Sequence, residues 1–272
     1  MSLWIGEALS PLERACIQSF LAGGHDFELY TYGPVSFIPE GCRLLDASAI
    51  VPADRIFAHR NGEGQGSVAA FSDLFRYELL YLHGGWWVDL DVFCLSATFP
   101  DQQVVIARQG PTVVNGAVLK FPPGHPLMRA ARAACVVASE QSDWGEMGPD
   151  LLTRLVGELG MHSQVMSPES FYPVDWQHYW AVIDPRRTAD VARRTQGATC
   201  IHLWNEMLRR IGIDKGVLPP DGSLLRALYE STIGLGEFTR EYVLASGCAP
   251  DALQLEIRTR TSVPDRGGPA DG

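Results

Sequence analysis

Hydrophobic and polar positions follow two different periods along the first hundred residues of this 272-residue chain. A period of two predicts short strands, whereas apolar residues spaced three and four apart predict amphipathic helices. The strands predicted in this way lie at residues 3–6, 26–32, 42–48 and 86–93, and the helices lie at residues 10–24 and 71–85. Because strands alternate with helices, we expect an α/β fold with a Rossmann-like, mainly parallel sheet flanked by helices.

The ends of these helices carry local signals. Ser10 is placed to cap the first helix, Pro11 suits its first turn, and Glu13 occupies the capping-box position. Glycine pairs follow both helices, Gly23 after the first and Gly84 after the second, which predicts where each helix ends.

The second half of the chain is less regular. Strands are predicted at residues 103–109 and 112–121, and helices at 126–140 and 148–160. The segment SPESFYPVDWQHYW, residues 167–180, is rich in aromatic residues and proline and favours the wall of a pocket. We expect one large domain over residues 1–245, divided into halves at 1–100 and 101–245, followed by a disordered tail over 246–272.

Composition narrows the classes of partner. The net charge of −10 argues against a protein that binds nucleic acid through its phosphates. No stretch of about 18–20 apolar residues predicts a transmembrane helix, and the N-terminus lacks the pattern of a signal peptide. The six cysteines form no CxxC pair, which favours reduced thiols in a cytoplasmic protein.

The apolar run WWVDLDVF, residues 86–93, contains two carboxylates that a strand does not need. If the run is one strand, Asp89 and Asp91 project to the same side, roughly 6–7 Å apart. No basic residue within the run balances them, and two shielded carboxylates repel each other. A divalent cation, Mg²⁺ or Mn²⁺, would neutralise them and could bridge to the phosphates of a nucleoside diphosphate.

An Asp-X-Asp pair after a strand also suits an aspartyl-phosphate phosphatase. That reading requires a hydroxyl residue after Val92, where this chain has Phe93 and Cys94, and a later acidic pair that is not evident. A nucleotidyltransferase would require a basic, glycine-rich loop near the N-terminus, and LWIGEALSPLE has neither feature. A non-catalytic binding module is the remaining alternative.

The block FSDLFRYELLYLHGGWWVDLDVFCL, residues 71–95, resembles the signature of the DXD-containing sugar transferases. This family includes the clostridial glucosylating toxins, the yeast initiating mannosyltransferase and bacterial capsule or lipopolysaccharide transferases. The resemblance extends over residues 3 to about 210, with shorter matches at VNGAVLKFPPGHPLM, GPDLLTRLV and HLWNEMLRR. It implies a GT-A fold, with nucleotide-sugar binding in residues 1–100 and acceptor binding or closure in 101–245.

The resemblance also implies roles for individual residues. Asp91 would bind the metal, and Asp89 would hold the ribose and reach the metal directly or through water. His202, or Asn205 one turn later, would complete the metal or diphosphate site. A lone histidine in such apolar surroundings is as often structural.

On the donor side, Asp73 and Arg76 would contact hydroxyls of the sugar, and Trp4 would stack on the base. Each also has a plainer reading, because Asp73 could cap its helix, Arg76 could form an ion pair, and Trp4 could pack in the core. Tyr77 and Asn115 belong to the same expected nucleotide-sugar site.

The family implies a retaining transferase that uses Mn²⁺ or Mg²⁺ and a UDP- or GDP-sugar donor. The acceptor would be a glycan or a lipid-linked glycan, in capsule or lipopolysaccharide synthesis, in the cytoplasm or at the inner face of the membrane. Retention requires a carboxylate nucleophile, for which Glu146 and Asp150 are the candidates, or front-face attack, which the family favours.

Trp176, with Tyr179 and Trp180, suits an acceptor pocket, and the glycine-rich loop at residues 61–66 suits a cover over the donor.

Overall fold

The computed structural model describes residues 1–60, 62–137, 143–246 and 253–260. The chain begins with a parallel sheet of three strands in the order β1 (Ser2–Trp4), β2 (Phe27–Thr31) and β3 (Cys42–Asp46). The helix α1 (Pro11–Ala22) connects β1 to β2. These elements agree with the predicted strand–helix–strand order.

The start of α1 confirms the predicted capping box. The backbone N–H of Ser10 donates to Glu13 Oε2 at 3.0 Å, and Pro11 occupies the first turn. Glu13 is almost fully buried, and its carboxylate also pairs with Lys215 from the C-terminal half. The capping residue therefore also connects the two halves of the chain.

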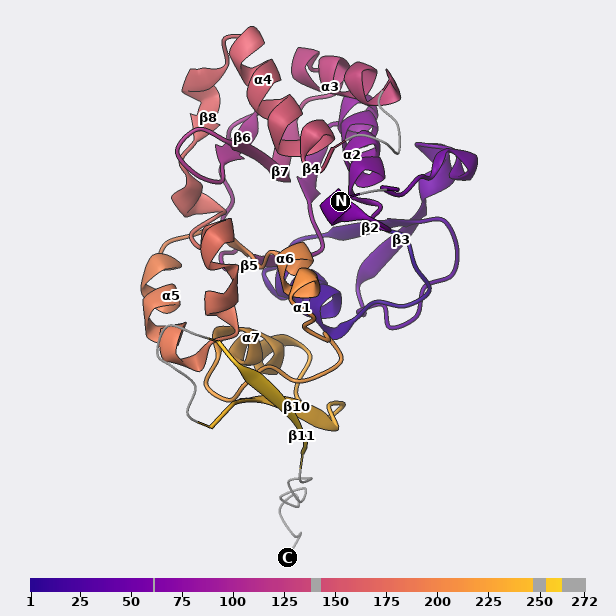
Figure 1. The fold of residues 1–272 in the computed structure, drawn as a ribbon. Coiled ribbons are helices and arrows are strands. Elements are labelled where there is room, and N and C mark those ends of the chain that lie inside the picture. Colours follow the sequence, from indigo (N-terminus) through magenta and orange to yellow (C-terminus); the bar gives the residue numbers. More distant parts are fainter. Residues whose placement is uncertain (61, 138–142, 247–252, 261–272) are drawn as a thin grey trace, which may run out of the picture.

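A second sheet lies above the first in Figure 1, with strand order β4 (Gly85–Val88), β7 (Val114–Phe121), β6 (Val105–Arg108) and β8 (Val165–Met166). Pairing is antiparallel in β4–β7 and β6–β7 and parallel in β6–β8. One apolar cluster joins this sheet to the helices α2 (Ala69–His83), α3 (Pro126–Val137) and α4 (Leu151–Glu158). The α/β fold class is confirmed, with parallel pairing confined to β1–β2–β3 and β6–β8 among the described strands.

The strand predicted over residues 86–93 is in fact two strands. The first, β4, ends at Val88, and β5 (Val92–Cys94) begins after a turn and pairs with β9 (Cys200–His202) in a separate antiparallel ladder. The pattern of apolar residues is the same for one buried strand and for two, because both halves are buried.

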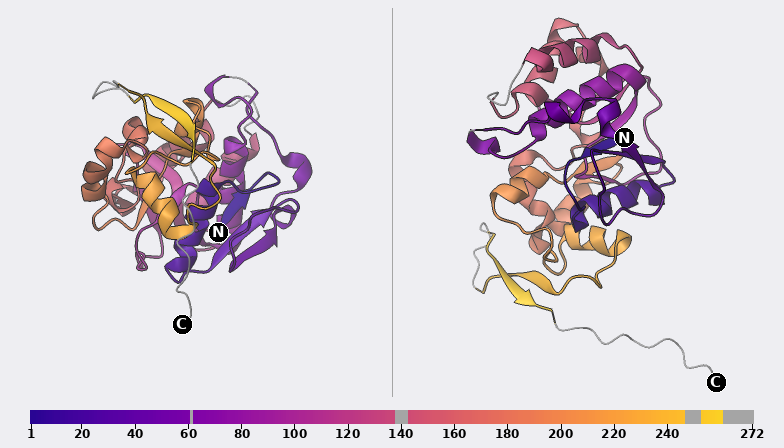
Figure 2. Two further views of the ribbon diagram at one scale, coloured as in Figure 1. Left: turned by 90° about the horizontal axis from the view of Figure 1, so that it is seen from below. Right: turned by 90° about the vertical axis from the view of Figure 1, so that its right-hand side faces the viewer.

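The C-terminal half surrounds the β5–β9 ladder with the helices α5 (Thr188–Arg194), α6 (Asn205–Arg210) and α7 (Leu224–Thr232). A hairpin of β10 (Arg240–Leu244) and β11 (Leu255–Thr259) forms the lower end of the described structure in Figure 1 and in the right view of Figure 2. The strand β11 corrects the expectation of a disordered tail from residue 246, because these residues pair in register with β10. The rest of that segment, residues 247–252 and 261–272, lies outside the described residues.

Short 3-10 helices and one π turn fill connections in both halves of the chain, and most of them lie in the second half, which was predicted to be less regular. The 3-10 helices are η1 (Ala47–Ala49), η2 (Ala53–Arg55), η3 (Gly62–Gly64), η5 (His162–Gln164), η6 (Pro168–Ser170), η7 (Trp176–Val182) and η8 (Pro185–Arg187), and the π turn is η4 (Glu146–Asp150). The aromatic segment at residues 167–180 is therefore irregular but ordered.

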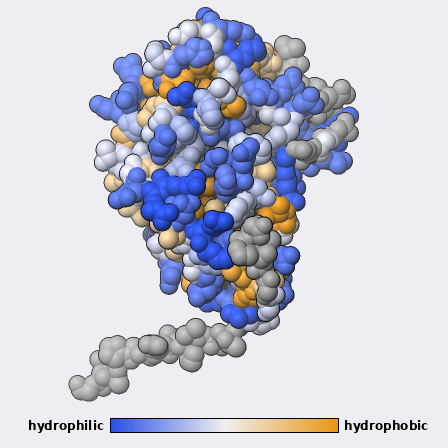
Figure 3. All heavy atoms as spheres, turned by 60° about the vertical axis from the view of Figure 1, so that its left-hand side comes forward, coloured by the Kyte–Doolittle hydropathy of each residue, from blue (hydrophilic) through white to orange (hydrophobic). Residues whose placement is uncertain are grey.

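The thiols and the surface agree with the expectations from composition. Five cysteines are free and three of the five are nearly inaccessible, whereas Cys248 lies outside the described residues. Figure 3 shows a face that is mostly hydrophilic, with apolar side chains in separate small groups. Among the described helices, none has the length and hydropathy to cross a membrane.

We expect replacement of Gly84, which joins α2 to β4, to destabilise the fold strongly. Its φ is 65°, and an added Cβ would lie 2.5 Å from Pro123 Cδ and 2.8 Å from the Phe121 carbonyl oxygen. The variant Gly84→Ala should lower the free energy of unfolding by about 3 kcal/mol or more, measured by urea denaturation. Gly124→Ala is the control, because its φ of 72° is similar but its Cβ would meet no atom within 4 Å, so it should lose only about 1 kcal/mol. Equal losses would contradict the argument.

Candidate active site

The Asp-Leu-Asp sequence occupies the turn where the chain leaves one sheet and enters another. Val88 closes the pairing of β4 with β7, and Val92 opens the pairing of β5 with β9. The Asp89 N–H donates to the Ala117 carbonyl at 2.8 Å, and the Asp89 carbonyl accepts from the Val92 N–H at 3.0 Å. The main chain of the turn is thus satisfied, which leaves both carboxylates available for other partners.

The Asp91 carboxylate is held by the segment that follows β9. His202 lies opposite Val92 in the β5–β9 ladder, and its Nε2 is 3.1 Å from Asp91 Oδ2. The Asn205 N–H donates to the same oxygen at 2.9 Å. Strand pairing therefore brings together two groups that are 111 positions apart in the sequence.

Trp204 makes this arrangement possible. It adopts a left-handed conformation, with φ 54° and ψ 47°, which turns the chain so that the Asn205 N–H points at Asp91. Such a conformation costs about 1–3 kcal/mol for a residue other than glycine. The indole compensates by donating from Nε1 to the Val174 carbonyl at 2.8 Å and by packing 4.0 Å from the His202 ring.

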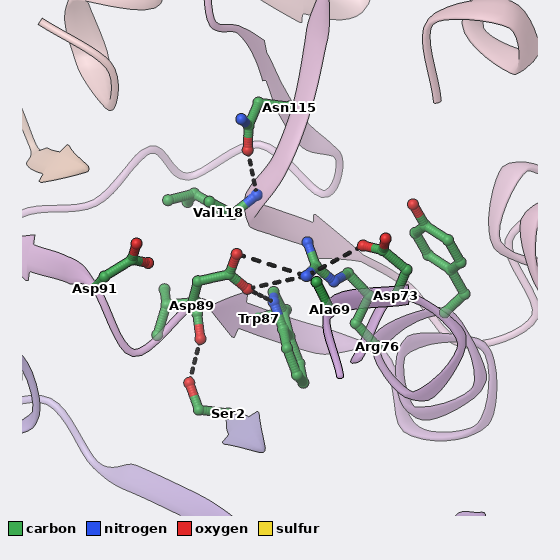
Figure 4. Close-up of polar contacts among 12 residues, drawn as sticks. Ser2, Ala69, Asp73, Arg76, Trp87, Asp89, Asp91, Asn115 and Val118 are labelled. Carbon is green, nitrogen blue, oxygen red and sulfur yellow. Dashed lines mark hydrogen bonds and ion pairs between the residues drawn. The ribbon is translucent and has the colours of Figure 1, made fainter. Parts of the chain in front are cut away.

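The Asp89 carboxylate faces the helix α2. Arg76 Nη2 is 3.2 Å from an oxygen of Asp89 and 3.2 Å from an oxygen of Asp73, so the guanidinium bridges the two acids (Figure 4). Trp87 Nε1 donates to Asp89 at 2.6 Å, and its ring lies 5.2 Å from the Arg76 guanidinium. Arg76 thus forms the ion pair that was one sequence-based alternative, but α2 begins at Ala69, so Asp73 does not cap it.

Two glycines provide the space for this buried network. A Cβ on Gly116 would lie 2.6 Å from Arg76 Nη1, and a Cβ on Gly148 would lie 3.0 Å from Asp73 Oδ2. These residues come from β7 and η4, so three separate elements enclose the pair of Asp73 and Arg76.

One group of side chains has the geometry of a metal site. One potential ligand atom from each of Asp89, Asp91 and His202 lies within 4.8 Å of the others. His202 Nδ1 and the side-chain oxygen of Asn205 are buried and have no hydrogen-bond partner among the described residues. His202 contributes a side-chain nitrogen to this group, whereas Asn205 donates its backbone N–H to Asp91.

The pKa values of the three acids are shifted in different directions. Burial raises the pKa of Asp89, and Asp91 raises it further, although Arg76 opposes both effects. Burial also acts against the charged form of Asp91, but His202 and the Asn205 N–H outweigh it and hold the pKa of Asp91 below its usual value. The pKa of Asp73 rises to about 6, chiefly because of burial. Asp73, Asp89 and Asp91 therefore have Arg76 as their one permanently charged basic neighbour in the described site. A bound cation would reduce the remaining excess of negative charge.

Two cavities open on either side of these acids, and Asp89, Asp91 and Arg76 line both. The smaller cavity, of about 230 Å³, includes Trp4 from the end of β1. The larger cavity, which we call the central cavity, has a volume of about 510 Å³ and includes Asp73. The network of Asp89, Asp91 and Arg76 thus stands between two spaces of molecular size.

Most residues proposed from the sequence line one of these cavities. Trp4 lies in the smaller one, and Asn115, Asp150 and Trp176 lie in the central one. Asn115 is fixed by its side-chain oxygen, which accepts from the Ala117 N–H at 2.6 Å. The structure therefore gathers residues from β1, α2, β7, η4, η7 and β9 around the DXD turn.

Four proposed residues lie in neither cavity, namely Tyr77, Glu146, Tyr179 and Trp180. Tyr77 is fully buried, lines neither cavity, and donates its hydroxyl to the Met147 carbonyl at 3.0 Å, which corrects the expectation of a direct donor contact. Glu146 also lines neither cavity, since its carboxylate accepts from the Asp143 N–H at 2.9 Å. Tyr77 directly follows Arg76 in α2, and its side chain is buried in the core.

Sequence reasoning missed much of the cavity wall, including Trp144, Glu206 and Arg210. Trp144 and Glu206 line both cavities, and Arg210 lines the central one. Arg210 lies 4.6 Å from the Trp144 ring, and its Nε donates to Glu206 at 3.0 Å. Only the i, i+4 pairing of Glu206 with Arg210 leaves a signal in the sequence.

Residue 61 of the expected glycine-rich cover lies outside the described residues, and closure of this loop over a donor stays a prediction.

Comparisons with known proteins point to sugar transferases. A model of the alpha 1,4-glycosyltransferase conserved region matches residues 120–229, and a model of capsular polysaccharide synthesis proteins matches residues 53–109. The chain is 27% identical over 146 residues to lactosylceramide 4-alpha-galactosyltransferase of Rattus norvegicus, covering 50% of this chain and 40% of the relative. It is 25% identical over 174 residues to alpha-1,4-N-acetylglucosaminyltransferase of Homo sapiens, covering 58% and 48%.

These matches support the resemblance to DXD-type glycosyltransferases. The chain spans less than half the length of either relative. Among solved structures, the PaToxG glycosyltransferase aligns with a TM-score of 0.43 and 13% identity, over 84% of this chain and 80% of that one.

We expect Asp73 to make stability depend on pH in an unusual direction. Its pKa is about 6 in the folded protein and 3.8 ordinarily, so the stability that it contributes is present below pH 3.8 and lost as the pH rises through 6. The free energy of unfolding of the wild type minus that of Asp73→Asn should therefore fall between about pH 4 and 6.5, measured by urea denaturation.

Asp184→Asn provides a control of opposite sign. Burial raises the pKa of Asp184, but hydrogen bonds from Arg186 outweigh it and the net pKa is lowered. The same difference should rise with pH for this variant, in the range below pH 4. A flat profile for Asp73→Asn would contradict the assignment.

Proposed function

We propose that this chain, a relative of the DXD-type glycosyltransferases, transfers a sugar from a nucleoside diphosphate donor to a hydroxyl group of a glycan. The observation that supports this most directly is the grouping of Asp89, Asp91 and His202 between two cavities, with Arg76 and Asp73 beside it. In this proposal, the group of two acids and a histidine holds the metal and the diphosphate, and Arg76 and Asp73 hold the sugar.

The residues present fit a divalent cation such as Mn²⁺ or Mg²⁺. Two carboxylates and one imidazole are suitable ligands, and the low pKa of Asp91 keeps that carboxylate ionised at neutral pH. Asp89, Asp91 and His202 would hold the ion, which supplies positive charge beside the departing diphosphate. The Asn205 N–H already orients Asp91, so the ligand is positioned before any ion binds.

The two cavities suggest where the donor lies. Trp4 in the smaller cavity offers its ring to the base, with Asp89 near the ribose, as the family resemblance implies. Asp73 and Arg76 face the central cavity and would hold hydroxyls of the sugar. The donor in this proposal is a UDP- or GDP-sugar.

The acceptor would enter the central cavity from the side of Trp176, which is 43% exposed. A glycan or lipid-linked glycan is favoured because one relative is named for lactosylceramide and a matched family for capsular polysaccharide synthesis. We place the reaction in the cytoplasm, or at the inner face of a membrane, in accordance with the free thiols of the five described cysteines.

Both relatives are named as alpha-transferases. Nucleotide-activated galactose and N-acetylglucosamine carry the alpha configuration, so an alpha product corresponds to retention. Of the two carboxylates proposed as nucleophile, Asp150 lines the central cavity and Glu146 does not. We favour front-face attack, in which the leaving phosphate guides the acceptor and no enzyme carboxylate bonds to the sugar.

Removal of the Asp91 charge should abolish metal-dependent donor binding. With Mn²⁺ present and a nucleotide at 100 times its dissociation constant, the wild type should gain about 2.7 kcal/mol of stability in thermal shift against UDP and GDP. Asp91→Asn should lose this gain, and titration calorimetry should show no Mn²⁺ binding. Asp101→Asn, at an exposed position outside both cavities, is the control and should behave as the wild type. A full shift in Asp91→Asn would exclude the proposed site.

The variant Asp150→Asn distinguishes the two routes to retention. If attack is front-face, kcat should stay within about ten-fold of the wild type, because Asp150 only lines the cavity. A fall by many orders of magnitude would instead identify Asp150 as the nucleophile. Transfer measured with the donor that the thermal-shift assay identifies gives kcat, and the anomeric proton signal of the product reports retention.

A further inference from the structure

A third cavity, of about 440 Å³, is lined by residues of the C-terminal half of the chain. We call it the distal cavity, and it is lined by Tyr179, Trp180, Ile211, Gly212, Ile213, Tyr242, Leu253 and Leu255. Nothing in the proposed reaction uses it, because the metal ligands and the donor-facing residues all lie elsewhere.

The same two elements form walls of both cavities. In α6 and the residue after it, Arg210 lines the central cavity and Ile211 lines the distal one. In η7, Trp176 lines the central cavity and Tyr179 the distal one. Adjacent Cα atoms are about 3.8 Å apart, and three residues span at most about 11 Å, so the two cavities adjoin the same two short segments.

The wall of the distal cavity suits sugar rings. Tyr179 and Trp180 are half-buried, and the Arg187 guanidinium, which does not line the cavity, lies 5.5 Å from the Trp180 ring. Tyr242 adds a hydroxyl that already accepts from the Asp214 N–H at 2.8 Å. Three aromatic side chains that carry two hydroxyls and an indole N–H match a ring with apolar faces and hydroxyl edges, and four aliphatic side chains complete the wall.

We propose that the distal cavity binds the sugars of an oligosaccharide acceptor that lie beyond the residue being glycosylated. The acceptor hydroxyl occupies the central cavity, and the chain passes along α6 and η7 into the distal cavity. The inference rests on the proposed function for the identity of the ligand, but it concerns binding and does not depend on transfer. It assigns this protein a preference for acceptors longer than a disaccharide.

The test measures how affinity depends on glycan length. The probes are the disaccharides and tetrasaccharides of three series, maltose with maltotetraose, chitobiose with chitotetraose, and lactose with lacto-N-neotetraose. Titration calorimetry or saturation-transfer NMR reports binding to the full chain without donor. In at least one series the tetrasaccharide should bind the wild type about ten-fold more tightly than the disaccharide.

Two matched substitutions locate this gain. Ile211 is 48% exposed and caps the end of α6, so Ile211→Arg places a long charged side chain in the distal cavity without disturbing the core. Leu159 is 42% exposed, caps the end of α4 with nearly the same backbone conformation, and lines neither cavity. Ile211→Arg should lose the gain with length and keep the affinity for the disaccharide, whereas Leu159→Arg should keep both.

Equal affinities for short and long probes in the wild type would overturn the proposal, as would a gain that survives Ile211→Arg. Failure of the proposed function has a separate signature: the wild type would gain no stability from nucleotide and Mn²⁺, or Asp91→Asn would keep the full gain. The two results are independent because the glycan titration contains neither donor nor metal.

Discussion

The site depends on one change of strand partner. After Val88 the chain leaves the sheet built on β7, and from Val92 it pairs with β9. The three residues between must cross from one sheet to the other, so their side chains face the junction and not the interior of either sheet. This junction is where Asp89 meets α2 and Asp91 meets the segment after β9.

Burying these acids requires compensation, and the fold provides it from several directions. Arg76 bridges Asp73 and Asp89, and Trp87 donates to Asp89, while a histidine and a backbone N–H hold Asp91. The compensation is partial, since the pKa of Asp73 and that of Asp89 stay raised. A site that remains short of positive charge after folding is prepared for a cationic ligand, and the two adjoining cavities leave room for what that ligand would bring.

The halves of the chain contribute unequally. The first half supplies most of the charged network, and the second supplies His202, the left-handed turn at Trp204 and the walls formed by α6 and η7. Glu13 and Lys215 join the halves beside Trp4, whose ring lies 6.0 Å from the Lys215 ammonium. Contacts between the two halves of the chain therefore contribute to the relative positions of the elements that line the two cavities.

The sequence by itself determined the local features. Residues 10–24 specify a helix and its ends, because capping and glycine stops act within one turn. Asp89 and Asp91 were recognisable as two acids in an apolar run, and the family resemblance implied Asp73 and Arg76 beside them. Arg76 is ion-paired with Asp73 and Asp89 in the structure.

Tertiary structure alone decided the rest. Periodicity cannot distinguish one buried strand from two that change partner, and for that reason the break at Asp89 was not visible. His202 joins Asp91 through a strand register, Tyr77 turns into the core, and Trp144 and Arg210 meet across the cavity. These outcomes depend on contacts between residues far apart in sequence, which spacing along the chain does not encode.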